Sequence, residues 1–284
     1  MTHAPPIAAR AADDARTASA QAAPWIERLA RVGFAAKAVL YITVGSLAAR
    51  AALGDGGRTT GSRGALRTLL EQPLGKVLIA VIALGLFGYA AWRIVEAVAD
   101  PERKGSGAKG IALRAGYFAR GVMHAALGVE AVRLAAGGAG GDDGQSTEHW
   151  TARLLDAPMG ELLVYAAGAG VAAYGLYQLY AAFISKLSRQ LDLARLTDEA
   201  GRWTIAISRF GIAARGVVFV VAGIFLVIAA RRHDPSQAAG AGESLGAIGA
   251  QPFGTILLAA VAFGLIAYGL YQLINARYRR IRAG

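Results

Sequence analysis

The stretch RFGIAARGVVFVVAGIFLVIAA at residues 209–230 decides the fold, together with the stretch PFGTILLAAVAFGLIAYGLYQ that follows at residues 252–272. The same pair of apolar runs occurs twice earlier in the chain. We call the first run of each pair the A helix, which opens with Arg-x-Gly, and the second run the B helix, which opens with Pro-x-Gly. The A helices open at Arg31, Arg114 and Arg209, and the B helices open at Pro73, Pro158 and Pro252. The sequence therefore contains three copies of one two-helix unit.

The composition is that of a membrane protein. Of the 284 residues, 55% are hydrophobic and 17% are charged, whereas a soluble domain has about 25% charged residues. A helix needs ~20 apolar residues to cross the hydrocarbon core, and the runs lack the polar stripe of a soluble amphipathic helix. We therefore predict an all-α polytopic membrane protein with six transmembrane helices, at residues 32–52, 74–98, 115–136, 159–183, 210–230 and 254–275.

The repeats also set the predicted domain organisation. Residues 25–98, 99–183 and 184–275 form repeats 1, 2 and 3, with an Ala-rich tail at 1–24 and a basic tail at 276–284. Two spans return the chain to its starting side, so the three repeats run parallel about an axis along the membrane normal. A pseudo-threefold closure follows naturally, and an open row is the alternative. We expect the tail at 1–24 to be disordered, since it lacks the apolar core of a signal peptide.

The charge distribution predicts the orientation. The net charge is +11, and the segments on the side of the two termini hold more than half of the 30 Lys and Arg residues. The positive-inside rule then places both termini in the cytoplasm, and we expect the chain in the cytoplasmic (inner) membrane. Basic residues at that surface contact anionic lipid, so we expect anionic membrane lipids as partners and no nucleic acid.

The sequence offers no motif of an enzyme. Cysteine is absent, which excludes disulfides, thiolate catalysis and Cys-ligated metals. No His-Glu-x-x-His, Gly-x-Ser-x-Gly or phosphate-loop pattern occurs. We expect no enzymatic activity, no cofactor and no metal site; an enzyme would instead show a pocket that gathers Arg93, Glu96, Arg120 and His124.

The repeats align a set of candidate site residues. Counting from the Arg of the A helix, position A+6 is always a cation; counting from the Pro of the B helix, positions B+16 and B+19 are always aromatic. These residues are Lys37, Arg120 and Arg215 at A+6, Tyr89, Tyr174 and Tyr268 at B+16, and Trp92, Tyr177 and Tyr271 at B+19. At ~1.5 Å per residue, the cations lie about 9 Å from the inner boundary and the tyrosines about 24 Å from the outer one. In a core ~30 Å thick these two depths coincide.

This cation–aromatic layer has two interpretations. The cations can reach toward the interface with cation–π support from the rings, or the layer can bind anionic headgroups. The repeated glycines on the helices indicate close helix packing.

Four further polar residues lie within the predicted spans and are candidates by position alone. They are Arg93, Glu96, His124 and Glu130. His124 follows Arg120 by one helical turn and takes the position that Tyr41 and Phe219 occupy in the other repeats. It either fills space or relays protons with Glu130 or Glu96.

The segment before each Pro carries leucines at helical spacing, as at Leu66, Leu69 and Leu70. This spacing predicts a short amphipathic helix at the outer interface of each repeat. The Pro itself suits the first position of the following B helix, where its missing N–H has no cost.

The chain resembles a bacterial membrane family known as domain of unknown function 1206. The resemblance rests on the runs at Arg209–Gly216, Gln251–Gly254, Ala267–Gln272 and Lys104–Gly110. It covers about residues 25–284 and implies the three-repeat, six-span architecture, but it implies no activity. Repeat 2 departs most, because Asp156-Ala157-Pro158 replaces the Gln-Pro of the pattern.

The sequence thus favours a non-enzymatic structural or interaction protein with a layer near the inner leaflet that contacts anionic lipid. The alternative is a channel or transporter for a small solute or ion along the pseudo-threefold axis.

Overall fold

The computed structural model describes residues 7–100, 105, 107–138, 143–184 and 197–279, and these form an all-helical structure. Six long helices carry the repeats: α1 (Ile7–Leu53), α3 (Gly75–Ala99), α4 (Ala108–Ala135), α6 (Gly160–Ile184), α7 (Asp198–Arg232) and α9 (Gly254–Tyr278). Shorter elements connect them: α2 (Ser62–Leu70), α5 (Asp143–Leu155), the turn η3 (Pro235–Gln237) and α8 (Ala241–Gly249). The predicted all-α class is confirmed for these residues.

Five of the six long helices are long and apolar enough to cross a membrane. They lie at Glu27–Leu53 within α1 and over the whole of α3, α6, α7 and α9. The helix α4 has the length of a span, but Arg120, His124 and Glu130 lower its hydropathy. Several apolar helices of this length mark a multi-pass membrane protein, and the sixth span remains a prediction.

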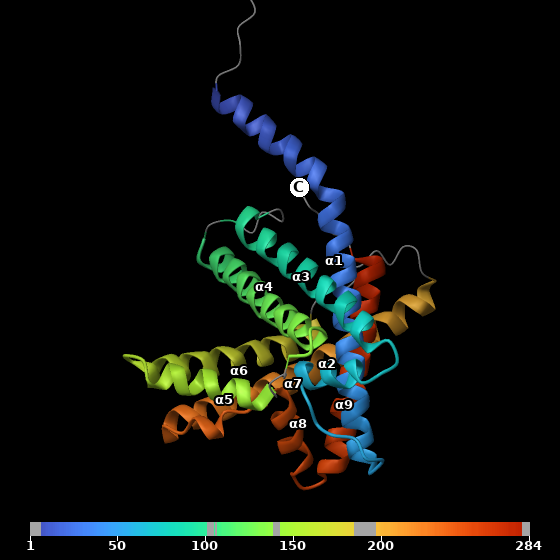
Figure 1. Cartoon of the computed structure of the whole chain (residues 1–284), viewed down its shortest axis with the longest axis vertical. Coiled ribbons are helices and arrows are strands. Elements are labelled where there is room, and N and C mark those ends of the chain that lie inside the picture. The colour runs from blue at the N-terminus through green and yellow to red at the C-terminus, as the bar shows by residue number, and fades with distance from the viewer. Residues whose placement is uncertain (1–6, 101–104, 106, 139–142, 185–196, 280–284) are drawn as a thin grey trace, which may run out of the picture.

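The helix α1 extends into the segment 1–24, for which the sequence predicts a disordered tail. It begins at Ile7, and residues 1–6 lie outside the described part of the chain. The segment is rich in alanine, the residue with the highest helix propensity, so it continues the helix of the first span instead of leaving it. Figure 1 shows α1 bending in this N-terminal part. At the other terminus, α9 extends to Tyr278 into the predicted basic tail, whose residues 280–284 are likewise outside the described part.

The Pro-x-Gly sequences form turns, and this corrects the expected role of the proline. The proline lies two residues before the B helix instead of at its first position. In repeat 1, the N–H of Gly75 donates to the carbonyl of Gln72 at 2.8 Å, and Leu74 has a φ of 60°. Pro at the second position and a positive φ at the third are the features of a type II turn. Met159 and Phe253 have the same φ of 60°, so all three repeats turn alike.

A short helix precedes each of these turns, as the leucine spacing predicts. The helices α2 and α8 place Leu66 and Leu245 in the central hydrophobic cluster, where both are fully buried. The helix α5 buries Leu155 against Val164 and Ala230. These connections are therefore packed parts of the fold.

Each B helix packs against the A helix of the following repeat. The helix α3 lies along α4, α6 lies along α7, and α9 returns to lie along α1. Within a repeat, α1 also packs on α3 and α7 on α9, but among the described residues α4 and α6 make only marginal contact. In Figure 1 the pair α1/α9 follows the long axis of the molecule, whereas α3/α4 and α6/α7 leave it at large angles. The three pairs are splayed.

In repeats 1 and 2, the Arg that opens the A helix caps the B helix of the preceding repeat in the cyclic order. Arg31 donates to the carbonyl oxygen of Ala276 at 2.7 Å, at the end of α9. Arg114 donates to the carbonyl oxygen of Ala97 at 2.7 Å, at the end of α3. The last carbonyls of a helix lack partners and carry partial negative charge, so a guanidinium stabilises them. The motif thus joins neighbouring repeats.

Candidate anion site between the repeats

The cation at A+6 lies over the B+16 tyrosine of its own repeat in all three copies. The distances from the cationic group to the ring centroid are 4.1 Å for Lys37 and Tyr89, 5.2 Å for Arg120 and Tyr174, and 5.0 Å for Arg215 and Tyr268. These distances are within the ~6 Å reach of a cation–π interaction. The structure therefore brings together the cations and tyrosines that the repeat alignment places at one depth.

The aromatic residue at A+10 packs against the B+16 tyrosine of the preceding repeat, edge to face for Tyr41 and Phe219 and tilted for His124. The ring centroids are 4.6 Å apart for Tyr41 and Tyr268, 4.6 Å for His124 and Tyr89, and 5.4 Å for Phe219 and Tyr174. Each B+16 tyrosine thus contacts two repeats, which makes the layer continuous through the protein. The alignment of the repeats places an aromatic residue at A+10 in every copy, but it cannot show which ring is its neighbour.

Arg215 is the most extensively bonded cation of the layer. Its Nε donates to the hydroxyl of Tyr41 at 2.8 Å, and its Nη1 donates to the side-chain oxygen of Gln178 at 2.5 Å. A longer bond of 3.4 Å reaches the hydroxyl of Tyr174. These groups come from helices α1 and α6, so Arg215 on α7 joins all three repeats. All three partners are neutral, and none of them is a carboxylate that would balance the charge of the guanidinium.

Arg93 and Glu96 form a buried ion pair on α3. The distance from Nη1 of Arg93 to Oε2 of Glu96 is 2.6 Å, and the exposed fractions of the two residues are 6% and 3%. The Nε of Arg93 also donates to the hydroxyl of Tyr89 at 2.8 Å, and the guanidinium lies 4.3 Å from the ring centroid of Trp92. Arg93 is therefore neutralised within the protein, and Trp92 takes part in the same cluster.

The two other B+19 residues differ from each other. Tyr271 is buried and stacks on Tyr268 at 5.8 Å. Tyr177 is instead 57% exposed, and its contact with lipid stays a prediction. The reason for this exposure is local to repeat 2, since α4 does not pack over this part of α6.

The remaining polar candidates are His124 and Glu130, both on α4. The Nδ1 atom of His124 is 2.7 Å from the carbonyl oxygen of Arg120, one turn earlier on α4. Glu130 is half-buried on the same helix, and it is not among the residues that line the cavity described next. The bond to Arg120 holds the His124 ring against its own helix, and the proton relay with Glu130 or Glu96 stays a prediction.

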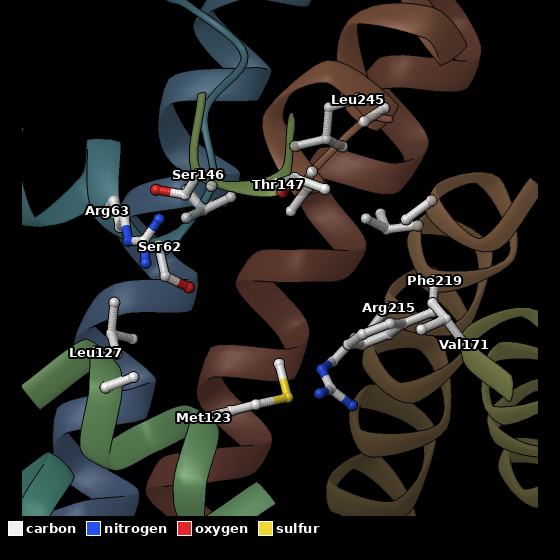
Figure 2. A pocket seen from close by; sticks show the side chains of 18 of the residues that line it. Ser62, Arg63, Met123, Leu127, Ser146, Thr147, Val171, Arg215, Phe219 and Leu245 are labelled. Atoms are coloured by element: carbon white, nitrogen blue, oxygen red, sulfur yellow. The ribbon is translucent and has the colours of Figure 1, made fainter. Parts of the chain in front are cut away.

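A cavity of about 540 Å³ lies where the three repeats meet. One end is formed by the cation–aromatic layer, with Lys37, Tyr41, His124 and Arg215. Its waist is apolar and is lined by α1, α4, α6, α7 and α9. The opposite end is formed by the short helices α2, α5 and α8 and the segment before α8. Figure 2 shows Arg215 from α7 and Met123 from α4 reaching into this space, with Ser62, Arg63 and Thr147 at the far end.

The lining of the cavity is positively charged. Lys37, Arg63 and Arg215 line it, and no Asp or Glu of the described chain does. Lys37 and Arg215 are 4% and 8% exposed. Of the four residues expected to gather in an enzyme pocket, His124 alone lines the cavity. The arrangement is therefore suited to an anion that carries an apolar group, since the charged end adjoins an apolar waist.

Several lining residues escape sequence reasoning. Ser62, Arg63, Thr147 and Trp150 lie in the connections that precede the B helices, where the repeats differ in length and share only the leucine spacing. Nothing in the sequence indicates that these connections fold over a shared cavity.

Comparisons with known proteins agree with the repeat pattern. The family model described as Domain of Unknown Function (DUF1206) matches three times, at residues 32–100, 115–185 and 210–279. A protein of Bacillus subtilis (strain 168) described as uncharacterized protein YxxB is 32% identical over 258 residues, which covers 91% of this chain and 93% of the relative. No solved structure matches. The resemblance inferred from the sequence is confirmed, and the chain belongs to the family described as Domain of Unknown Function (DUF1206).

Proposed function

We propose that the chain is a non-enzymatic protein of the cytoplasmic membrane that holds an anionic lipid at its cation–aromatic layer. The observation that carries this proposal is the lining of the central cavity. Cations adjoin an apolar waist there, and no Asp or Glu of the described chain lines the cavity. The B-to-A packing that recurs in cyclic order supports a pseudo-threefold arrangement of six spans around this cavity.

The energetic argument concerns Lys37 and Arg215. A charge inside a membrane protein has a high desolvation cost unless an opposite charge accompanies it. The hydroxyls of Tyr41 and Tyr174 and the amide of Gln178 solvate Arg215, but they do not neutralise it. A phosphate group at this end of the cavity would supply the counter-charge, and charge-assisted hydrogen bonds to phosphate are among the strong ones.

The orientation follows from the distribution of Lys and Arg. With both termini in the cytoplasm, the layer faces the inner leaflet, where anionic headgroups are abundant and attract basic residues. The layer then lies below the headgroup region, so the lipid headgroup would be drawn slightly into the protein.

The test removes the three cations together. In the variant Lys37→Gln, Arg120→Gln, Arg215→Gln, purified in nanodiscs, we expect bound phosphatidylglycerol measured by mass spectrometry to fall to the background level. The control Arg50→Gln, Arg133→Gln, Arg231→Gln removes the same charge from exposed positions at the opposite helix ends and should keep its lipid.

If the triple variant does not fold, Arg120→Gln alone provides the measurement, because Arg120 is only half-buried. Partial loss of phosphatidylglycerol is then expected. Unchanged lipid content in a folded variant would contradict the proposal.

A second candidate function is that of a channel or transporter for a small anion. The cavity between the three repeats favours it. Polar groups at both of its ends, Arg215 at one and Ser62 and Thr147 at the other, would suit a permeation path. Chloride flux into proteoliposomes decides between the two. Flux above protein-free vesicles that Arg215→Gln abolishes would establish transport, and no flux together with retained phosphatidylglycerol would support lipid holding.

A further inference from the structure

We infer that the lipid enters the central cavity from the side, through a gap between α4 and α6. In the bound state, one of its acyl chains lies in the cavity. This inference rests on the proposed function, because it assigns a route and a position to the lipid that the layer is proposed to hold. It starts from a difference between the three copies of one interface.

In repeats 1 and 3, glycines close the contact between the A helix and the B helix. A β-carbon added at Gly33 of α1 would lie 2.5 Å from Cβ of Tyr89 on α3, and one added at Gly85 of α3 would lie 2.7 Å from Cβ of Ala36 on α1. In repeat 3, Gly211 of α7 is pressed against the backbone of Tyr268 on α9 in the same manner. Small residues at such positions let two helices approach closely.

In repeat 2, the corresponding glycines face open space. A β-carbon added at Gly170 of α6 would meet no heavy atom of the described structure within 4 Å. One added at Gly116 of α4 would meet only the side chain of Arg120, on its own helix, at 3.9 Å. The motif for close approach is therefore present on both helices, but α4 and α6 stand apart.

The gap between these helices is continuous with the cavity. Met123, His124 and Leu127 of α4 line the cavity from one side, and Ala167 and Val171 of α6 line it from the other. On the helical wheel, Gly170 and Ala167 share one side of α6, since they are three residues apart. The opening thus leads from the lipid-facing surface of repeat 2 to the centre of the protein.

The chemistry at the gap fits an anionic lipid. Met123 of α4, an exposed apolar side chain, lines the cavity on this side of the helix and gives the gap an apolar wall. Arg120 reaches from α4 to the ring of Tyr174 on α6, at 5.2 Å, and so stands at the gap at the depth of the layer. A headgroup at this position would adjoin Arg120, while an acyl chain would follow the apolar waist beyond it.

The size of the cavity suggests one chain. Its volume of about 540 Å³ lies in the range of pockets that enclose a single drug-sized molecule, roughly 300–1,000 Å³. The second chain of a phospholipid would remain in the gap and in the bilayer. An opening between α4 and α6 allows one acyl chain to lie inside the cavity and the other outside it. A close contact between these two helices would exclude that arrangement.

The test blocks the gap after the protein has folded. The chain has no cysteine, so Gly170→Cys introduces a single thiol at the gap, and a maleimide with a bulky substituent can be attached to it in the membrane. The control is Ala169→Cys, an exposed neighbour about 100° around the helix from Gly170. Vesicles of deuterated phosphatidylglycerol serve as the probe, and mass spectrometry follows the exchange of protein-bound lipid for deuterated lipid.

We expect labelling of Gly170→Cys to slow the exchange by about tenfold, the effect of a modest added barrier, and labelling of Ala169→Cys to leave it unchanged. Equal exchange in both labelled variants would overturn lateral entry while leaving lipid binding intact. An unlabelled protein that retains no phosphatidylglycerol over phosphatidylcholine would instead overturn the proposed function. Release of a second copy or of another protein on labelling, with lipid content unchanged, would show that a protein fills the gap and would also overturn the inference.

Discussion

The A and B helices of repeat 1 are in close contact, whereas those of repeat 2 stand apart, although both repeats carry the same glycines at the same positions. Gly33 and Gly85 are buried in the contact between α1 and α3, and their equivalents Gly116 and Gly170 meet open space. The comparison teaches that a packing motif permits an interface and does not by itself form one. Two further interfaces are enough to join the three B-to-A helix pairs into one protein. The contacts α1–α3 and α7–α9 are these two interfaces.

The largest expected effect concerns the buried ion pair between Arg93 and Glu96 on α3, the helix that packs against α4. Glu96→Gln leaves the buried Arg93 without its carboxylate, and removal of one partner of a buried pair has a cost of about 3–5 kcal/mol. We expect a much lower thermal midpoint in nanodiscs, followed by circular dichroism. Glu130→Gln, at a half-buried carboxylate on α4, is the control and should change the midpoint little; equal midpoints for both variants would contradict the assignment.

The closed and open interfaces should respond to one methyl group with opposite signs. Gly33→Ala places a β-carbon 2.5 Å from Tyr89, and overpacking of this kind has a cost of up to about 3 kcal/mol. Gly116→Ala has room for the methyl and should stabilise the helix by up to about 1 kcal/mol. Unfolding titrations with sodium dodecyl sulfate measure both. A destabilised Gly116→Ala would mean that α4 and α6 close against each other in the membrane.

Loss of the layer cation should likewise destabilise the protein more at Arg215, between closely packed helices, than at Arg120, beside the open interface. Arg215→Gln removes the donors that satisfy Tyr41 and Gln178, and buried groups left without partners destabilise by about 2 kcal/mol. Arg120 at the gap has ring contacts with Tyr117 and Tyr174, which are worth about 0.5–1 kcal/mol. Thermal unfolding in lipid-free detergent should rank Arg215→Gln below Arg120→Gln. The reverse ranking would place the main support of the layer at repeat 2.

The smallest effect is expected at the caps between repeats. Arg31→Gln removes a guanidinium from the last carbonyls of α9, where such a charge contributes about 0.3–1 kcal/mol. Arg209 is the equivalent residue of repeat 3 and is exposed, so Arg209→Gln should have the smaller effect. Hydrogen exchange at the end of α9, compared between the two variants, reports the cap directly, and equal exchange would argue against its role.

Part of the candidate site could be predicted from the sequence. The cations at A+6 and the tyrosines at B+16 come to one level because helices of fixed rise carry them, and the structure has Lys37 over Tyr89 and Arg215 over Tyr268. The exposure of Tyr177 could not be predicted, because it depends on how a neighbouring helix is placed. The helix α1 includes part of the tail at 1–24, because alanine favours helix even where charges are scattered.

The sequence by itself determined the helices and the position of each charge along them, because hydrophobic runs and helical rise act over a few residues. The tertiary structure alone decided that each B helix pairs with the A helix of the following repeat, that α4 and α6 remain apart, and that a cavity lined by cations forms between the repeats. These features depend on contacts between segments far apart in the chain. Three copies of one motif offer three equivalent interfaces, and only the packing of the whole protein selects the one that stays open.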